Sequence, residues 1–123
     1  MFTHVMVGAN DKEASLTFYN AVLGALGIPE SSTGFYMHNG GAFGVGIPRN
    51  GDPATYANGG TIGFAAQNAE QVDAFHAAGL ANGGSCDGQP GKRPNAPGNA
   101  YGAYIRDPDG NKICAFCQLP EGE

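Results

Sequence analysis

Charged side chains, and basic ones above all, are scarce in this chain of 123 residues. Only 14% of the residues are charged, and six Lys and Arg stand against eleven Asp and Glu, which gives a formal net charge of −5. Nucleic acids and anionic membrane surfaces both attract clusters of Lys and Arg. The composition therefore argues against a nucleic acid and against a membrane surface as partners.

Cysteine is also rare, and long apolar runs are missing. Three Cys are too few for a disulfide scaffold, and no apolar run approaches the roughly 20 residues of a membrane-spanning helix. The first residues lack the basic and apolar regions of a secretory signal. We therefore expect a cytoplasmic protein with reduced thiols. Cys114 and Cys117 are spaced as C-x-x-C, but residues three apart in a strand lie on opposite faces, so no redox or zinc pair is expected.

Glycine is abundant, with 21 residues, and predicts many turns. The length suits a single domain that covers residues 1–123. Short apolar runs predict strands at residues 2–8, 34–38, 41–47, 59–67, 101–106 and 113–117. One helix is predicted from a cap at Asn10 or Asp11 to about residue 25, and a second from residue 68 to about 81. Residues 85–99 are rich in Gly and Pro and are predicted to form a long loop, with room for a short strand at 85–87.

The two predicted helices have recognisable apolar sides. The expected inward residues of the first are Ala14, Phe18, Ala21, Val22 and Ala25. The expected inward residues of the second are Val72, Phe75, Gly79 and Leu80, whereas His76 is expected near the surface.

An internal repeat relates the two halves of the chain. A shift of 57 residues, from His4 to Thr61, places Glu13 on Glu70 and Phe18 on Phe75. Both halves then read as a strand, a capped helix, a glycine stop and further strands. This order predicts two modules, at about residues 1–57 and 58–123.

The end of the chain predicts a β-hairpin. Residues 101–106 alternate in a two-residue period, Asp107-Pro-Asp-Gly-Asn111 supplies the turn, and residues 113–117 return. This string, from Tyr101 to Cys117, resembles the last hairpin of the vicinal oxygen chelate superfamily, which includes glyoxalases, bleomycin-resistance proteins and extradiol dioxygenases. The first predicted helix, with Ser15, Phe18-Tyr19 and Leu23-Gly24, is similar to the first helix of that family.

The resemblance implies an α+β fold in which two βαβββ modules form a half-open barrel around a cavity. It also implies that the chain forms a homodimer. Members that contain a metal bind it through four inward side chains. By the resemblance, the corresponding positions in this chain are His4, Gly44 or Val45, Thr61 and Cys114. Only His4 is a good ligand among these. We therefore expect no metal ligands and no cofactor, although a divalent metal remains an alternative.

The ligand-binding residues predicted for the cavity are His4, Met6, Thr61, Arg93, Tyr101, Cys114 and Phe116. Arg93 is the natural clamp for a carboxylate or phosphate, and the aromatic residues would form walls. The sequence does not identify catalytic residues. His38 precedes a tight turn and is expected at the mouth of the cavity or in water.

Three functions follow from the resemblance. The first is a small-molecule binding protein of the glyoxalase and bleomycin-resistance type without the usual metal site. The second is a divalent-metal-dependent lyase, isomerase or dioxygenase of the same superfamily. The third is a dimeric scaffold without catalysis. A shared fold does not choose among them, and the missing ligands favour the first.

Overall fold

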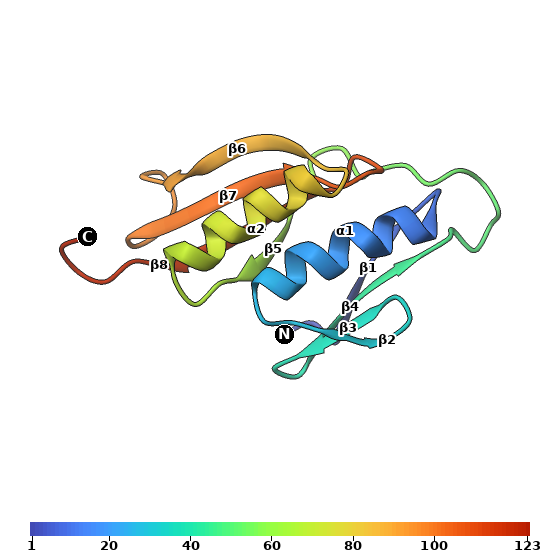
Figure 1. Ribbon diagram of the computed structural model, residues 1–123, viewed down its shortest axis with the longest axis horizontal. Helices are drawn as coiled ribbons and strands as arrows, with labels where there is room; N and C mark the ends of the chain where they lie inside the picture. Colours follow the sequence, from blue (N-terminus) through green and yellow to red (C-terminus); the bar gives the residue numbers. More distant parts are fainter.

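The computed structural model describes residues 1–123 and contains two helices and eight strands. In chain order they are β1 (His4–Gly8), α1 (Lys12–Ala25), β2 (Glu30–Ser32), β3 (Phe35–His38), β4 (Gly41–Gly46), β5 (Ile62–Ala65), α2 (Ala69–Ala81), β6 (Ser85–Lys92), β7 (Ala100–Arg106) and β8 (Lys112–Gln118). The order strand, helix and three strands therefore occurs twice (Figure 1). Neither helix is both long and apolar enough to cross a membrane.

Each half of the chain forms its own four-stranded sheet. The strand orders are β1-β4-β3-β2 and β5-β8-β7-β6, with the same pairing directions in both sheets. The first strand of each module runs parallel to the last, and the remaining pairs are antiparallel. The predicted α+β fold, two βαβββ modules in a half-open arrangement, is confirmed. The predicted boundary near residue 57 lies in the segment between β4 and β5.

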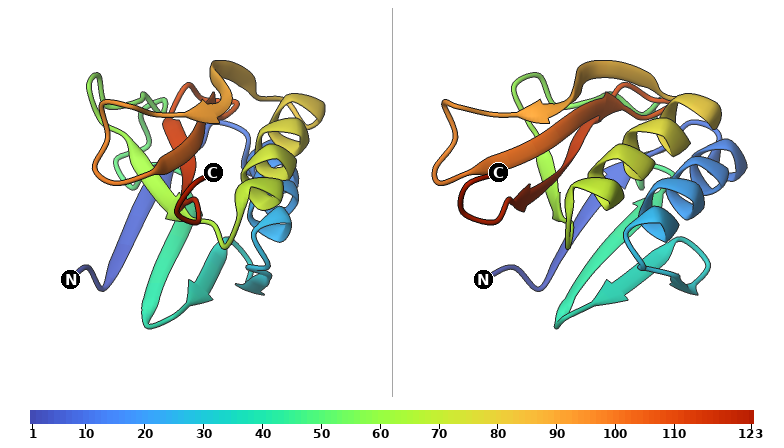
Figure 2. Two further views of the ribbon diagram at one scale, coloured as in Figure 1. Left: turned by 90° about the vertical axis from the view of Figure 1, so that its left-hand side faces the viewer. Right: turned by 60° about the vertical axis from the view of Figure 1, so that its left-hand side comes forward.

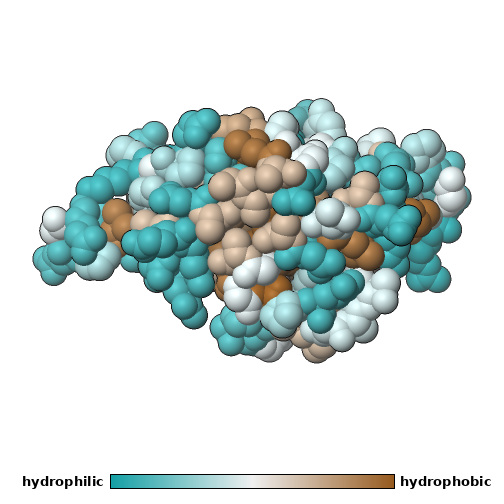
Figure 3. Space-filling view, in the orientation of Figure 1, coloured by the Kyte–Doolittle hydropathy of each residue, from teal (hydrophilic) through white to brown (hydrophobic).

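Both helices cover the same side of the two sheets, as the two views in Figure 2 show. In β1, Val5 and Val7 pack into the core beneath the helices, whereas His4 and Met6 alternate with them and point to the other side. We call this uncovered side of both sheets the open face. Figure 3 shows the helix side, where weakly hydrophobic residues lie over α2.

Of the two caps predicted for the first helix, Asp11 is the one observed, and the second helix begins next to its predicted start at Asn68; the buried side of each differs in part from the predicted stripe. Asp11 and Asn68 cap α1 and α2 by accepting hydrogen bonds from the N–H groups of Ala14 and Gln71. The buried residues of α1 are Ser15, Phe18, Tyr19, Val22 and Leu23. The prediction missed Ser15, Tyr19 and Leu23; Tyr19 is buried by Phe43 of β4 and by Asp107 of the turn between β7 and β8. In α2, His76 is buried against Cys86 of β6, and Leu80 is exposed.

The predicted loop at residues 85–99 is wrong in its first half, because β6 extends over Ser85–Lys92. This strand pairs with β7 through a register that shifts on both sides of Gly88. β6 lies at the edge of the sheet, so only one of its sides pairs with another strand. Pro90 has no N–H to donate, but at an edge this removes no hydrogen bond to a strand on the outer side, and the cost in stability is small. Pairing with β7 therefore outweighs the weak strand propensity of the segment.

The turn between β7 and β8 ties the two modules together. The carboxylate of Asp107 is buried and accepts hydrogen bonds from the Tyr19 hydroxyl of α1 at 2.6 Å and from the Asn111 side chain at 2.9 Å. Asn111 also donates to the carbonyl of Gly8, and Asp109 accepts from the N–H of Asn10. The turn thus fixes the end of β1 and the middle of α1 against the second sheet.

Candidate functional site

Four of the predicted site residues project from the open face. His4 and Met6 do so from β1, and Cys114 and Phe116 do so from β8, because their neighbours Ile113, Ala115 and Cys117 all pack into the core. Thr61 lies just before β5 and lines a cavity together with Met6. Strand alternation, which is readable in the sequence, places these side chains on one side.

Tyr101 does not lie with them, which corrects its assignment to the site. Its hydroxyl donates to Asp73 of α2 at 2.6 Å, so its ring is on the helix side of β7. Tyr101 shares the alternation of Ala103 and Ile105, which are fully buried core residues. Tyr104, three residues further on, is the tyrosine of β7 on the open face, and the two-residue period would have identified it.

Arg93 lies next to Tyr104, just after the end of β6. The Cζ atom of Arg93 is 5.5 Å from the centroid of the Tyr104 ring. Lys112 at the start of β8, which the sequence analysis did not select, places Nζ 4.8 Å from the same centroid. The Phe116 ring meets Tyr104 edge to face, with 5.6 Å between centroids. The second sheet therefore presents two cations around an aromatic pair.

Cys114 is buried among these groups, with 5% of its surface exposed. Burial raises the pKa of its thiol to about 11, and the positive charges of Lys112 and Arg93 oppose this shift without cancelling it. The thiolate is the form that attacks an electrophile or binds a metal. Cys114 is thus protonated near neutral pH and is suited to neither role.

The four metal-ligand positions of the superfamily do not carry a suitable donor set here. His4 offers an imidazole, Gly44 offers no side chain, and Thr61 offers a hydroxyl. Val45, the alternative to Gly44, is a core residue. No three His, Cys, Asp or Glu side chains come together anywhere in the chain. The residues present therefore do not fit the four-ligand site.

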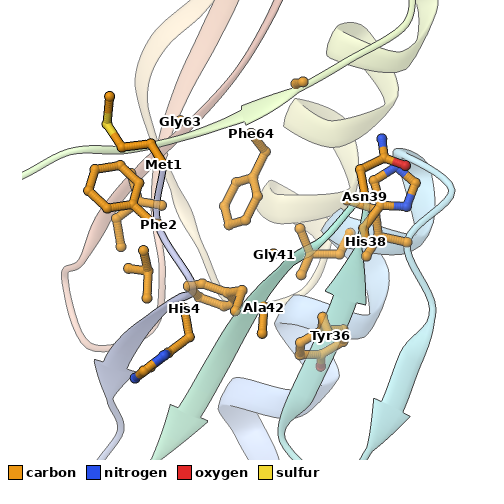
Figure 4. A pocket seen from close by; sticks show the side chains of 16 residues that line it. Met1, Phe2, His4, Tyr36, His38, Asn39, Gly41, Ala42, Gly63 and Phe64 are labelled. Atoms are coloured by element: carbon orange, nitrogen blue, oxygen red, sulfur yellow. The ribbon is translucent and has the colours of Figure 1, made fainter.

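Three of the seven predicted site residues line cavities, His4 one of them and Met6 and Thr61 another. The first, of about 370 Å³, opens between β1, the β3–β4 hairpin and β5, and is lined largely by apolar side chains such as Phe43 and Phe64 (Figure 4). His4 and His38 also line it. A second cavity, of about 290 Å³, lies at the junction of the two sheets and is lined by Met6, Thr61 and Lys112 among others. A third, of about 470 Å³, lies between Met6 and the segment after β4.

A histidine and a cysteine meet elsewhere, outside the predicted site. The Nε2 atom of His76 lies 3.1 Å from the Sγ atom of Cys86. Burial lowers the pKa of His76, and the negative charge of Asp73 opposes this shift. Cys86 pairs with Ile105, a core residue. The contact between His76 and Cys86 therefore belongs to the packing of α2 on its sheet.

Comparisons with known proteins agree on a family. The family model of the Glyoxalase/Bleomycin resistance protein/Dioxygenase superfamily matches residues 1–115. A search of the curated proteins finds no match. Among solved structures, a glyoxalase/bleomycin resistance protein from Albidiferax ferrireducens T118 is 58% identical, with a TM-score of 0.88, over 94% of this chain and 98% of that one.

More distant structures share the fold. A glyoxalase-related enzyme from Fulvimarina pelagi is 20% identical, with a TM-score of 0.73, over 94% of this chain and 86% of that one. A lactoylglutathione lyase from Agrobacterium tumefaciens is 24% identical, with a TM-score of 0.62, over 94% of this chain and 92% of that one. The match over residues 1–115 confirms the resemblance noted in the sequence: the chain belongs to the glyoxalase/bleomycin resistance protein/dioxygenase superfamily.

Proposed function

We propose that this protein binds a small molecule on its open face without the four-ligand metal site of metal-containing superfamily members. The observation that carries the proposal is the set of side chains on that face. His4, Met6, Cys114 and Phe116 project there, yet of the four metal-ligand positions only His4 carries a good ligand, and the others hold Gly44, Thr61 and the protonated thiol of Cys114. This combination suits contact with an organic ligand better than coordination of an ion.

A glycine of β4 lets two apolar side chains of the open face pack closely against the sheet. A Cβ atom at Gly44 would lie 2.2 Å from Met6 Sδ and 2.9 Å from the Phe35 ring, so both side chains lie across this strand. The cavity at the junction of the sheets, of about 290 Å³, is close to the lower limit of small-ligand sites, roughly 300 Å³. A compact ligand would contact both modules there.

Elemental analysis tests the metal-free part of the proposal. The untagged protein is purified without chelator and analysed for Mn, Fe, Co, Ni, Cu and Zn, and is then titrated with each divalent ion while its thermal midpoint is followed. We expect substoichiometric metal and no saturable rise in the midpoint. Near-stoichiometric metal, or a saturable rise that His4→Ala removes, would instead favour a metal-dependent lyase, isomerase or dioxygenase.

A ligand screen tests the binding part. Small aromatic and anionic molecules are added to the protein, and we expect at least one to raise the midpoint saturably. Thr61→Trp fills the cavity beside Met6 and should abolish that rise, whereas Thr17→Trp on the exposed side of α1 should preserve it. If no compound produces a shift, or if both variants behave alike, binding at the open face is contradicted and a scaffold role is favoured.

We also propose that the protein is a homodimer. The open face of the first sheet exposes apolar side chains, with 47% of Met6, 42% of Phe35 and 64% of Met37 accessible. Large exposed apolar patches in monomers commonly mark contact sites. A second copy on this face would cover these side chains and close one wall of the binding site.

A further inference from the structure

Half of the cations of this acidic protein lie on or beside the open face of the second sheet. The chain has six Lys and Arg and a formal net charge of −5. Arg93, Arg106 and Lys112 are nonetheless brought together by β6, β7 and β8. The carboxylate nearest to them is Asp87, which pairs with Arg106 at 3.0 Å and with Lys112 at 3.4 Å. Three positive charges therefore share one negative charge, and Arg93 forms no ion pair.

The guanidinium of Arg93 is held in place by the backbone. It donates hydrogen bonds to the carbonyl oxygens of Gln89, Gly91 and Lys92. These neutral acceptors orient the group but leave its charge uncompensated. A cation that is already oriented loses less conformational entropy when it binds an anion.

Arg93, which has no ion pair, and Lys112, which shares Asp87 with Arg106, lie beside an aromatic pair whose ring planes meet at 77°. Arg93 and Lys112 both lie within 6 Å of the Tyr104 ring, and Phe116 meets this ring edge to face. Both cations also act on the Cys114 thiol, since each opposes the rise in its pKa. The two positive charges therefore lie near Cys114 and the half-buried Phe116 of β8.

Glycines let these rings and the Arg93 guanidinium pack directly against the backbone. A Cβ atom at Gly102 would lie 2.5 Å from the Phe116 ring, and one at Gly88 would lie 3.0 Å from Tyr104 and 3.3 Å from Arg93 Nη2. Any larger residue would push the rings or the guanidinium aside. The Phe116 ring therefore rests directly on the backbone at Gly102, and because this residue is only half-buried, part of the ring is accessible for stacking.

We propose that the ligand of the open face is a planar aromatic anion, whose ring packs against Phe116 and Tyr104 and whose carboxylate is bound by Lys112 and Arg93. This inference rests on the proposed binding function and specifies the chemical class of the ligand. The aromatic pair supplies apolar contact area, and the two cations supply charge-assisted hydrogen bonds, which are the stronger kind. A neutral molecule of the same shape would use only the first of these.

Isothermal titration with 1-naphthoate and with its neutral isostere 1-naphthamide tests the inference. The proteins compared are the unmodified chain, Lys112→Gln, Arg93→Gln and Lys12→Gln. The last variant removes the same charge at the start of α1, on the helix side, and is the matched control. Circular dichroism and thermal midpoints show whether each variant is folded; should Arg93→Gln unfold, Lys112→Gln carries the test.

The expected result is saturable binding of naphthoate that weakens with added salt. Its Kd should rise at least about tenfold in Lys112→Gln and Arg93→Gln and should stay unchanged in Lys12→Gln. Naphthamide should bind at least about tenfold more weakly than naphthoate. Equal binding of both compounds, unaffected by either variant, would overturn the anion inference and leave the proposed binding function standing. Binding of neither compound would overturn the inference, and the ligand screen would then decide the proposed function independently.

Discussion

At the scale of single residues, Tyr19 makes the buried contact that joins the two modules. Its hydroxyl donates to Asp107 at 2.6 Å, and its ring packs against Phe18 and Phe43. Burial and the adjacent Asp107 carboxylate raise the pKa of this tyrosine well above its ordinary value. The hydroxyl is therefore protonated near neutral pH and can donate to Asp107.

Replacing Tyr19 with Phe should destabilise the protein. The variant leaves the ring in place and removes one donor from a buried carboxylate, which typically costs about 2 kcal/mol. Tyr36→Phe is the control, because the Tyr36 hydroxyl donates to the neutral side chain of Asn20 at 2.9 Å; it should cost about 1 kcal/mol. Urea unfolding measures both values. Equal stability of Tyr19→Phe and the unmodified protein would contradict the role assigned to this hydrogen bond.

At the scale of elements, the connection between α2 and β6 is packed closely around Gly84. A Cβ atom at Gly84 would lie 2.5 Å from the Phe18 ring, 2.7 Å from the carbonyl oxygen of Arg106 and 2.9 Å from that of Gly79. Two of these neighbours are backbone atoms of a strand and a helix, which cannot move separately. The close approach lets α2 turn directly into the edge strand.

Gly84→Ala should therefore destabilise the protein by about 3 kcal/mol, because the added methyl group forces the backbone apart. Gly24→Ala is the matched control, since Gly24 lies in α1 and no atom lies within 4 Å of its missing Cβ. Alanine is the better helix former, so this variant should be more stable by about 0.5–1 kcal/mol. Urea midpoints of the two variants should move in opposite directions. A shift of Gly84→Ala in the same direction as Gly24→Ala would show that the connection is not tightly packed.

At the scale of the whole molecule, the two sheets leave one side uncovered. The exposed apolar residues of the first sheet and the cations of the second lie on this side. We expect the first set to contact a second copy of the chain and the second set to contact the ligand.

Sedimentation equilibrium should accordingly find a dimer. Met37→Asp places a charge within the apolar patch and should raise the dimer dissociation constant by at least about tenfold. Leu80→Asp introduces the same charge at a comparably exposed position on α2, on the helix side, and should leave the dimer intact. A monomeric unmodified protein, or equal effects of the two variants, would contradict an interface on the open face.

The sequence alone determined the features that depend on neighbouring residues. The caps at Asp11 and Asn68, the Asn39-Gly40 turn with both residues at positive φ, and the inward and outward alternation of β1 and β8 all follow local rules. The repeat after 57 residues likewise identified the two modules, because it aligns the strand and helix of the first module with those of the second.

Only the tertiary structure decided the features that depend on distant partners. Pairing with β7 made a strand of residues that look like a loop, and packing of α2 on its sheet buried His76. The distant residues Phe43 and Asp107 buried Tyr19. β7, which lies between β6 and β8, brought Arg93 and Lys112 to the same Tyr104 ring. Local propensity is worth a few tenths of a kcal/mol per residue, whereas burial and pairing of a whole element are worth several times more. The long-range contacts therefore prevail wherever the two disagree.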